Sequence, residues 1–399
     1  MSALAGDTSK SILVHETRNG LRKRRRKPAD LVAFNNAVGI IVANLAHYTL
    51  FPPNTGQIIL PMGHPRAAQV ETPVPGFGTA LPSLVSSLEA IGVLHRTEPD
   101  TARFATTIAP TPAFRAEMAS RQISGDDFGR VQVGDCLRLT RRSASGEKNR
   151  LPIPSSSEPA RLRGEIHQIN EWLSDGDISY VGNLSIDVRD RSLVRCFNLP
   201  PHIEVPSLDF GGRLFGGFWQ RHGWEVRQHI RINGESVAEV DYGQMMPRLA
   251  YAEIGEKPPE GDLYAIAGLE GSRAAVKKAL NALLFKVGTM RRWPQEILDG
   301  LPQGWTGTKL RKAILCRHPS LASLVGSGAG YRLFNRESTI MCAVLLRCMG
   351  AGIVVLPIHD AVICSASSVP TVSTIMQEEA FKLCNAEIPV SVTKGEPSK

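Results

Sequence analysis

Two aspartates, Asp241 and Asp360, lie in sequences typical of β-strands, where carboxylates are uncommon. Residues 236–242 (SVAEVDY) follow an Asn-Gly turn signal and predict a strand that ends near the first aspartate. Residues 352–364 (GIVVLPIHDAVIC) predict a hairpin that carries the second aspartate, beside His359, at its tip or inner face. Either aspartate alone is most simply a turn residue. If the two converge, they form a site for divalent cations of the kind that assists phosphoryl transfer.

A predicted helix at 271–285 (GSRAAVKKALNALLF) lies between the two aspartates in the chain. Four of its side chains recur at every fourth position and therefore share one face over roughly 18 Å: Arg273, Lys277, Asn281 and Phe285. An arginine fork and a lysine point charge one turn apart can bind a triphosphate. An aromatic ring further along the face can stack on a base. On spacing alone, an amphipathic surface helix explains the pattern more simply.

Two segments resemble the palm motifs of family A DNA polymerases. Residues 240–252 (VDYGQMMPRLAYA) are similar to motif A, whose pattern is D-Y-S-Q-I-E-L-R, and the matching residues are Asp241, Tyr242, Gln244 and Arg248. Residues 358–362 (IHDAV) are similar to motif C, whose pattern is V-H-D-E, at His359 and Asp360.

The surrounding elements resemble the same family. The helix that carries Arg273 and Lys277 is similar to the fingers helix, whose pattern is Arg-x3-Lys-x3-aromatic-x3-Tyr, and GDLY at 261–264 resembles the G-D-I-H before it. GRL at 212–214 resembles the T-G-R-L element upstream of motif A. These elements follow the family's order, and the resemblance covers residues 211 to 370, which is under half of the chain.

The resemblance implies template-directed nucleotidyl transfer, with a DNA template and primer and nucleoside triphosphates as partners. Two Mg²⁺ ions would be bound by Asp241 and Asp360, helped by the backbone carbonyl of Tyr242. The triphosphate would be held by Arg273 and Lys277. The nucleotide site would also include Gln244, Met246, Asn281 and Phe285, the last near the nascent base pair. The nucleic-acid strand would be contacted by Arg213, Arg227 and His359.

Two acidic positions of the family's motifs are not acidic in this chain. The motif A glutamate, which helps to exclude ribonucleotides, is Met246. A thioether cannot accept the hydrogen bonds that a carboxylate accepts, so relaxed sugar selectivity or a primase activity stays open. The motif C glutamate is Ala361, which affects metal geometry or fidelity.

The fingers helix can be matched to the family in two registers. If Lys277 is the family's lysine, the fingers aromatic falls at Asn281; if Lys278 is that lysine, the aromatic falls at Ala282. We favour Lys277, because it then shares a face with Arg273.

The 399-residue chain has a net charge of +8, with 46 Lys and Arg against 38 Asp and Glu. Residues 1–50 hold eight of the basic residues and three acids, so much of the excess lies there. Such a basic segment favours nucleic acid as a partner, although a solvated tail explains it equally well. We expect Arg24 and Arg25, in the tract LRKRRRKP, to contact nucleic acid.

Composition argues against a membrane or secreted protein. The most apolar long segment, residues 31–50, contains three asparagines and a histidine, and the opening MSALAGDTSK has no apolar signal core. Seven cysteines include no C-x-x-C pair, so we expect reduced thiols and no zinc site. These features favour a cytoplasmic, nucleoid-associated protein, of phage or mobile-element origin if the resemblance holds.

The predicted fold class is α/β, of the α+β type: a polymerase-like right hand with an antiparallel palm sheet and helical fingers, plus an N-terminal helical, winged-helix-like domain. The winged-helix pattern rests on a helix at 79–96, a polar turn and a short strand. The expected order is a flexible basic arm (1–28), the winged-helix-like domain (29–139), a linker (140–160), a helical thumb-like region (161–209), and the palm and fingers (210–399).

Two other functions fit parts of the sequence. A non-catalytic DNA-binding replication initiator or regulator on a degenerate palm fits the basic arm and the winged-helix pattern. The four charged residues Asp241, Asp360, Arg273 and Lys277 speak against it. A metal-dependent nuclease would use the same two aspartates, but the Arg/Lys helix suits a triphosphate better.

Overall fold

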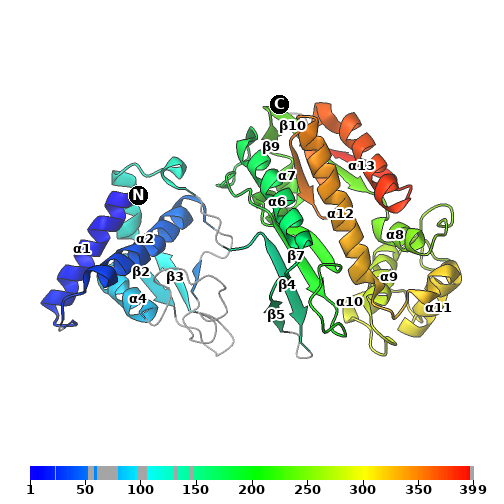
Figure 1. The fold of residues 1–399 in the computed structure, drawn as a ribbon, viewed down its shortest axis with the longest axis horizontal. Helices are drawn as coiled ribbons and strands as arrows, with labels where there is room; N and C mark the ends of the chain where they lie inside the picture. The colour runs from blue at the N-terminus through cyan, green and yellow to red at the C-terminus, as the bar shows by residue number, and fades with distance from the viewer. Residues whose placement is uncertain are drawn as a thin grey trace. The chain divides into compact units, whose positions relative to one another are not determined.

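The computed structural model describes residues 1–22, 24–52, 58–60, 80–97, 106–129, 134–143 and 147–395. The chain divides into two compact units (Figure 1). The first unit comprises Met1–Gly134 with Asn183–Asp187, and the second comprises Asp135–Gly182 with Val188–Lys399. Both combine helices with sheets that are mostly antiparallel, so the fold is mixed α and β.

The first unit packs helices against a three-stranded antiparallel sheet of order β1-β3-β2. Its elements are α1 (Ser2–Arg18), α2 (Pro28–Leu50), β1 (Ile58–Ile59), α4 (Leu81–Ala90), β2 (Leu94–Thr97), β3 (Thr107–Pro110) and α5 (Pro112–Ser120). The predicted helix at 79–96 is shorter than expected: α4 ends at Ala90, Gly92 follows at φ +73°, and the next residues form β2. The predicted turn between β2 and β3 falls at 98–105, outside the described residues.

Helix α2 is the core helix of the first unit. By length and apolar composition it is the one helix among the described residues that could cross a membrane. Its apolar side is nevertheless buried against the sheet and the other helices, with Val38, Val42 and Leu45 each 0% exposed. Packing within the unit accounts for this side of the helix, while Val32 near its start is 60% exposed.

The predicted flexible arm at 1–28 is wrong for most of its length, because residues 2–18 form α1. Leu4 and Ile12 of this helix are buried in the core of the first unit, which supplies the packing that orders it. The connection to α2 is held by Arg26, which donates two hydrogen bonds to Glu16 (2.6 and 2.7 Å). The Arg26 guanidinium also lies 3.9 Å from the ring centre of Phe34.

The second unit contains a six-stranded sheet, a four-stranded sheet and eight helices of the described range. Its first elements are β4 (Leu137–Arg142), β5 (Lys148–Leu151), α6 (Ser157–Asp175), β6 (Ile178–Tyr180), β7 (Val194–Leu199), β8 (Gly211–Phe215), α7 (Trp224–Arg227), β9 (Ile230–Ile232) and β10 (Glu235–Tyr242). The later ones are α8 (Met245–Glu253), α9 (Arg273–Phe285), α10 (Gln295–Leu298), α11 (Gly307–Arg317), α12 (Ala329–Gly350), β11 (Val355–Ile358), β12 (Ala361–Ser365), α13 (Val369–Cys384) and β13 (Val390–Lys394).

The larger sheet has the order β11-β12-β10-β9-β6, and β13 also pairs with β10. The turn between β9 and β10 is the predicted Asn-Gly turn, with Asn233 at φ +53° and Gly234 at φ +74°. The predicted hairpin is also confirmed, since β11 and β12 pair directly around His359 and Asp360. Helix α9 spans the predicted Arg273–Phe285.

The smaller sheet has the order β5-β4-β7-β8. Two predicted segments, the linker and the thumb-like region, differ from expectation here. The predicted linker at 140–160 forms most of the β4–β5 hairpin and the start of α6. The predicted thumb-like region at 161–209 contributes β6 to the larger sheet and β7 to the smaller one, so apart from residues 183–187 it belongs to the same unit as Asp241 and Asp360. Leu137 and Leu139 are fully buried while the edge strand β5 is mostly exposed, which gives that strand the polar composition of a loop.

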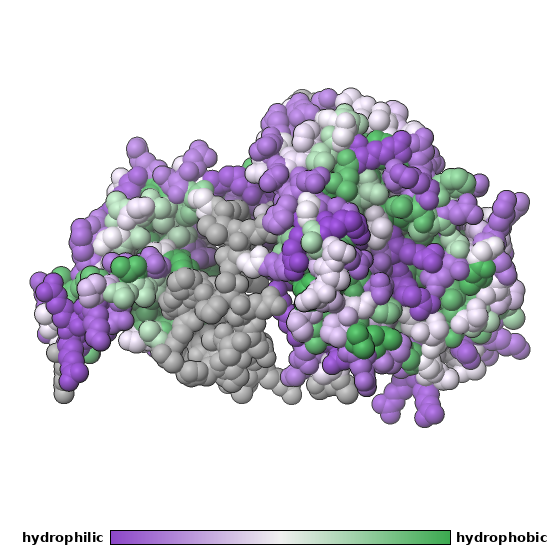
Figure 2. Space-filling view, in the orientation of Figure 1, coloured by the Kyte–Doolittle hydropathy of each residue, from purple (hydrophilic) through white to green (hydrophobic). Residues whose placement is uncertain are grey.

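Figure 2 shows hydrophilic side chains over most of the visible face of each unit, with hydrophobic ones in small separate patches. Hydrophilic side chains also gather at the end of the first unit where α1 leads into α2 (Figures 1 and 2). Arg24 and Arg25 are exposed on this connection.

Candidate active site

Asp241 lies on β10, and Asp360 lies in the turn between β11 and β12, directly before the first residue of β12. Asp241 is opposite Ala361 in the β10–β12 ladder, and the backbone N–H of Tyr242 donates to the carbonyl of Asp360 at 3.2 Å. The Tyr242 side chain is 2% exposed, and its hydroxyl donates to the carbonyl of Met376 on α13. Because side chains alternate across a strand, Asp241 points to the face away from α13. The structure thus brings both predicted aspartates together.

Burial and neighbouring charges raise the pKa of Asp241 from 3.8 to about 7. Burial is the largest cause, because it disfavours the ionised carboxylate. The negative charge of Asp360 is the next cause, and Lys277 of α9 acts in the opposite direction. Two carboxylates and one cation therefore share one electrostatic environment, as a cation-binding site requires.

Asp241→Asn is expected to stabilise the metal-free protein at pH 8 by about 2 kcal/mol, less than the full pKa change implies because the side chain is partly exposed. A carboxyl group whose pKa rises on folding stabilises the protein below pH 4, and this stabilisation is lost as the pH rises through about 7. The gain should therefore shrink as the pH falls from 7 and vanish below the unfolded pKa of 3.8. Urea unfolding in EDTA measures it, and equal stability of both proteins at pH 8 would contradict the prediction.

Helix α9 presents its two adjacent lysines to different surroundings. The charge of Lys277 acts on Asp241 and on Glu337 of α12, so this lysine faces the carboxylates. Lys278 instead bonds Glu296 of α10 at 2.5 Å. Asn281, one turn beyond Lys277, has a buried side-chain oxygen without a hydrogen-bond partner among the described residues. Lys277 and Lys278 thus differ in their charged neighbours, and which of them meets a nucleotide stays a prediction.

Arg273, at the start of α9, is bound to Asp262 through two hydrogen bonds of 2.6 and 3.2 Å. Asp262 also accepts a bond from Gln244 (3.0 Å) and one from the backbone N–H of Tyr264 (3.1 Å). The hydrogen bond from Arg273 is the main reason why the pKa of Asp262 lies below its usual range. Gln244 thus ties the end of motif A to the segment before α9.

The segment that carries Asp262 and Tyr264 is anchored by a buried histidine. His318 is 1% exposed; its Nε2 bonds the carbonyl of Leu263 at 2.7 Å, and its Nδ1 bonds the hydroxyl of Tyr251 at 3.0 Å. Tyr264 is 3% exposed, and its pKa is raised by burial and by the negative charge of Asp360. Its ring centre lies 5.1 Å from the Arg273 guanidinium, so a rigid segment borders the carboxylates.

Two predicted nucleotide-site residues have packing roles in this state. Met246 is 5% exposed within the first turn of α8. Phe285 lies against Tyr331 and Phe334 of α12, with ring centres 5.1 and 4.5 Å apart. The absence of a side chain at Gly330 leaves room for the ring, since a Cβ there would lie 2.6 Å from it.

Arg213 on β8 binds Glu337 of α12, a residue that the sequence analysis missed. Its Nε and Nη2 donate to the two carboxylate oxygens at 2.5 and 2.8 Å. Glu337 is 0% exposed. A signal was present in the sequence, because this acid interrupts the apolar helical stripe formed by Leu333, Ile340 and Val344.

The remaining predicted nucleic-acid contacts differ in their accessibility. His359 takes φ +55° at the hairpin tip, and its ring packs 5.3 Å from that of Phe215. Burial is the main reason why its pKa is lowered, followed by the charge of Arg213. Arg227 is paired with Glu239 at 2.7 Å, and its side chain is 13% exposed.

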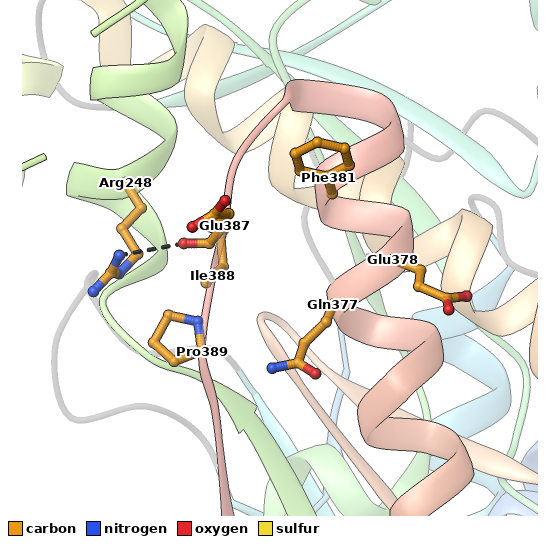
Figure 3. Close-up of a pocket in the computed structure, with 7 residues that line it drawn as sticks. All are labelled: Arg248, Gln377, Glu378, Phe381, Glu387, Ile388 and Pro389. Carbon is orange, nitrogen blue, oxygen red and sulfur yellow. Dashed lines mark hydrogen bonds between the residues drawn. The ribbon is translucent and has the colours of Figure 1, made fainter. Parts of the chain in front are cut away.

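A cavity of about 670 Å³ lies beside α8 and α13 (Figure 3). Arg248 reaches across one side of it and donates to the carbonyl of Glu387 at 3.2 Å, while Gln377, Glu378 and Phe381 line it from α13. Neither aspartate lines this cavity. Arg248, the last motif A match, therefore ties α8 to the segment before β13.

The donor set of the candidate site is two carboxylates and nearby backbone carbonyls. Among the described residues, no group of three or more His, Cys, Asp or Glu is arranged to hold a metal. Mg²⁺ is commonly bound through one or two carboxylates, with water and substrate phosphates as its other ligands. The pair Asp241 and Asp360 fits that ion.

No family model matches the chain, and no curated protein matches it. Among solved structures, the POL domain of Pol1 from M. smegmatis, in complex with DNA primer-template and dNTP, is similar over 60% of this chain, at 12% sequence identity and a TM-score of 0.32. The chain spans about half (51%) of the length of that structure. A weak structural neighbour of this chain is thus a DNA polymerase domain, and so low a TM-score does not establish a common fold.

Proposed function

We propose that the chain is a template-directed nucleotidyltransferase of the DNA polymerase type, which uses two Mg²⁺ ions. The observation that carries the proposal is that Asp241 on β10 lies beside Asp360 in the β11–β12 turn, with the charge of Lys277 of α9 acting on Asp241. In this proposal the larger sheet of the second unit is the palm, and α9 to α11 form the fingers.

Asp241 and Asp360 would hold the metal ions, with the backbone carbonyl of Tyr242 as a further donor. Bound Mg²⁺ would lower the charge on the reacting phosphate and assist both the attacking and the leaving oxygen. The high pKa of Asp241 means that its carboxyl group must lose a proton to bind the ion. The protein's own contribution is then positioning and electrostatic stabilisation.

Arg273 and Lys277 would bind the incoming triphosphate. Without a ligand, the Arg273 guanidinium donates hydrogen bonds to the Asp262 carboxylate. A triphosphate would compete with this carboxylate, and Gln244 and Tyr264 border the same place. With Met246 at the motif A glutamate position, no carboxylate there would exclude a ribose 2′-hydroxyl.

The exposed basic residues between α1 and α2 would bind the nucleic-acid backbone. Arg24→Ala/Arg25→Ala is expected to flatten the slope of log K against log salt by about 2, because about 0.9 counterions are released per phosphate contact. Fluorescence anisotropy with duplex DNA at several salt concentrations measures this slope.

Arg26→Ala is the matched control on the same connection. Its guanidinium is turned inward to Glu16, with side chains 9% and 11% exposed, so its loss is expected to destabilise the first unit by about 3 kcal/mol. If Arg24 and Arg25 instead changed stability and left the salt slope intact, the assigned contacts would be wrong.

Primer extension with Mg²⁺ tests the proposed function directly. The full chain, a primed DNA template, and dNTPs or rNTPs in separate reactions should give template-dependent products. Incorporation of both sugars at similar rates would match the methionine at position 246. Tight DNA binding with no incorporation of either nucleotide would overturn the proposal and favour the non-catalytic initiator or regulator.

A further inference from the structure

A buried ion pair joins α12 to strand β8 beside the two aspartates. Glu337 is fully buried, and a buried carboxylate is costly unless its oxygens are hydrogen-bonded. The Nε and Nη2 groups of Arg213 satisfy both oxygens. This fork fixes the plane of the guanidinium, and the outer nitrogen Nη1 has no hydrogen-bond partner in the part of the chain that the structure describes.

One face of α12 lies between this arginine and α9, the proposed fingers helix. The Arg213 guanidinium lies 3.6 Å from the ring centre of Phe334. The same ring packs at 4.5 Å against Phe285, the last residue of α9. Gly330, Phe334 and Glu337 are spaced at i, i+4 and i+7 and so lie on one side of α12. Phe334 therefore contacts both Arg213 and the last residue of α9.

The ion pair is also close to the proposed metal ligands. The charge of Glu337 acts on Asp241, and the charge of Asp360 acts on Glu337. The charge of Arg213 acts on His359, the neighbour of Asp360. Arg213 is partly exposed (21%), whereas its partner is not exposed at all. The arginine is thus the member of the pair that a ligand can reach.

We propose that Glu337 is a positioning residue: it holds the Arg213 guanidinium so that its free edge donates to the nucleic-acid strand that ends at Asp241 and Asp360. This inference rests on the proposed function for the identity of the strand. The acid acts only through the arginine, which is the group that touches nucleic acid. Phe334 supports the same orientation by covering one face of the guanidinium.

A role in positioning and a role in neutralising charge predict opposite changes in DNA affinity. Burial raises the pKa of Glu337 to about 7, so the comparison is made at pH 8, where the carboxylate is mostly ionised. If Glu337 merely neutralised Arg213, Glu337→Gln would then add close to one positive charge and tighten DNA binding. If Glu337 positions Arg213, the same change releases the guanidinium from its fixed plane and weakens binding, although the protein becomes more basic. The sign of the change separates the two roles without any need for catalysis.

The experiment compares dissociation constants for a primed DNA template by fluorescence anisotropy, without nucleotide, for the full-length wild type and variants. Glu337→Gln is expected to weaken binding about fivefold to tenfold, the loss of one well-oriented charge-assisted hydrogen bond. Arg213→Ala should weaken it by a similar factor, and the double variant should be no weaker than Arg213→Ala. Arg213→Lys keeps the charge but loses the fork, so it should resemble Glu337→Gln.

Glu253→Gln is the matched control. Glu253 also binds an arginine of α12, Arg332 at 2.6 Å, and its side chain is only 12% exposed. It belongs to α8 and binds Arg332, not Arg213. Affinity within twofold of the wild type, or tighter, is expected for this variant. Thermal melting shows whether each variant is folded. If Glu337→Gln is not folded, the DNA affinity of Arg213→Lys decides whether the orientation of the guanidinium matters.

Binding by Glu337→Gln as tight as or tighter than that of the wild type would overturn the inference, as would a double variant much weaker than Arg213→Ala. Failure of the proposed function has a different signature. In that case the wild type would bind primed DNA but would not extend it, while the affinity comparison would still decide the role of Glu337.

Discussion

Asp241→Asn is expected to lower nucleotide incorporation by about a thousandfold or more, which corresponds to about 4 kcal/mol of lost transition-state stabilisation. The amide has nearly the same shape but carries no charge, so it cannot hold a divalent cation between β10 and the β11–β12 hairpin. Single-turnover extension of a labelled primer at saturating nucleotide measures the loss. Asp360→Asn should behave in the same way, because the two carboxylates flank the same position.

Glu235→Gln is the matched control for the aspartates. It removes the same charge from the same strand, but Glu235 is exposed at the start of β10 and binds Ser367. Its incorporation rate should stay within twofold of the wild type. Retention of more than a tenth of the activity by both Asn variants would exclude these carboxylates as the metal ligands.

Lys277→Ala is expected to lower kcat/KM for the nucleotide by about a hundredfold, the loss typical of one preorganised group that stabilises developing charge. The charge of Lys277 already acts on Asp241 and Glu337, so in the proposed function it would meet a triphosphate beside the carboxylates proposed to bind the metal. Steady-state extension kinetics with a single dNTP give the ratio. The substitution should change kcat and KM for the nucleotide and leave the dissociation constant for DNA nearly unchanged.

Lys278→Ala tests the register of α9 at the adjacent position. Lys278 binds Glu296 on the surface, and such exposed pairs contribute little. Its kcat/KM should therefore match that of the wild type. A larger loss for Lys278→Ala than for Lys277→Ala would show that the helix presents the other lysine to the nucleotide.

The local elements that carry the candidate site could be predicted from the sequence because their signals are local. The Asn-Gly pair, the alternating apolar residues and the recurrence of side chains at every fourth position of α9 depend only on nearby residues. Accordingly, β10, the β11–β12 hairpin and α9 have the expected positions. The pairing of β10 with β12 is not local. Two acids in separate strands suggested it, and only the structure supplies the register in which Asp241 lies opposite Ala361.

Other features depend on partners far away in the chain. Glu337 is buried because Arg213, 124 positions earlier, supplies its hydrogen bonds. Phe285 lies on the predicted face of α9, but its ring packs against α12 because Gly330 has no side chain there. The polar composition of residues 140–160 resembled a linker, since an edge strand with one solvent-exposed side has the same composition as a loop.

The strand that carries Asp241 has its long pairings with segments synthesised much later. Strand β10 pairs with β12 along one edge and with β13 along the other, while β9 meets only its first two residues. During synthesis on the ribosome, β10 therefore emerges without the neighbours that complete its hydrogen bonds, and such non-local pairing forms slowly. A nascent chain released before β13 would expose one edge of the strand that bears Asp241, so translation must pass residue 394 before the candidate site is enclosed.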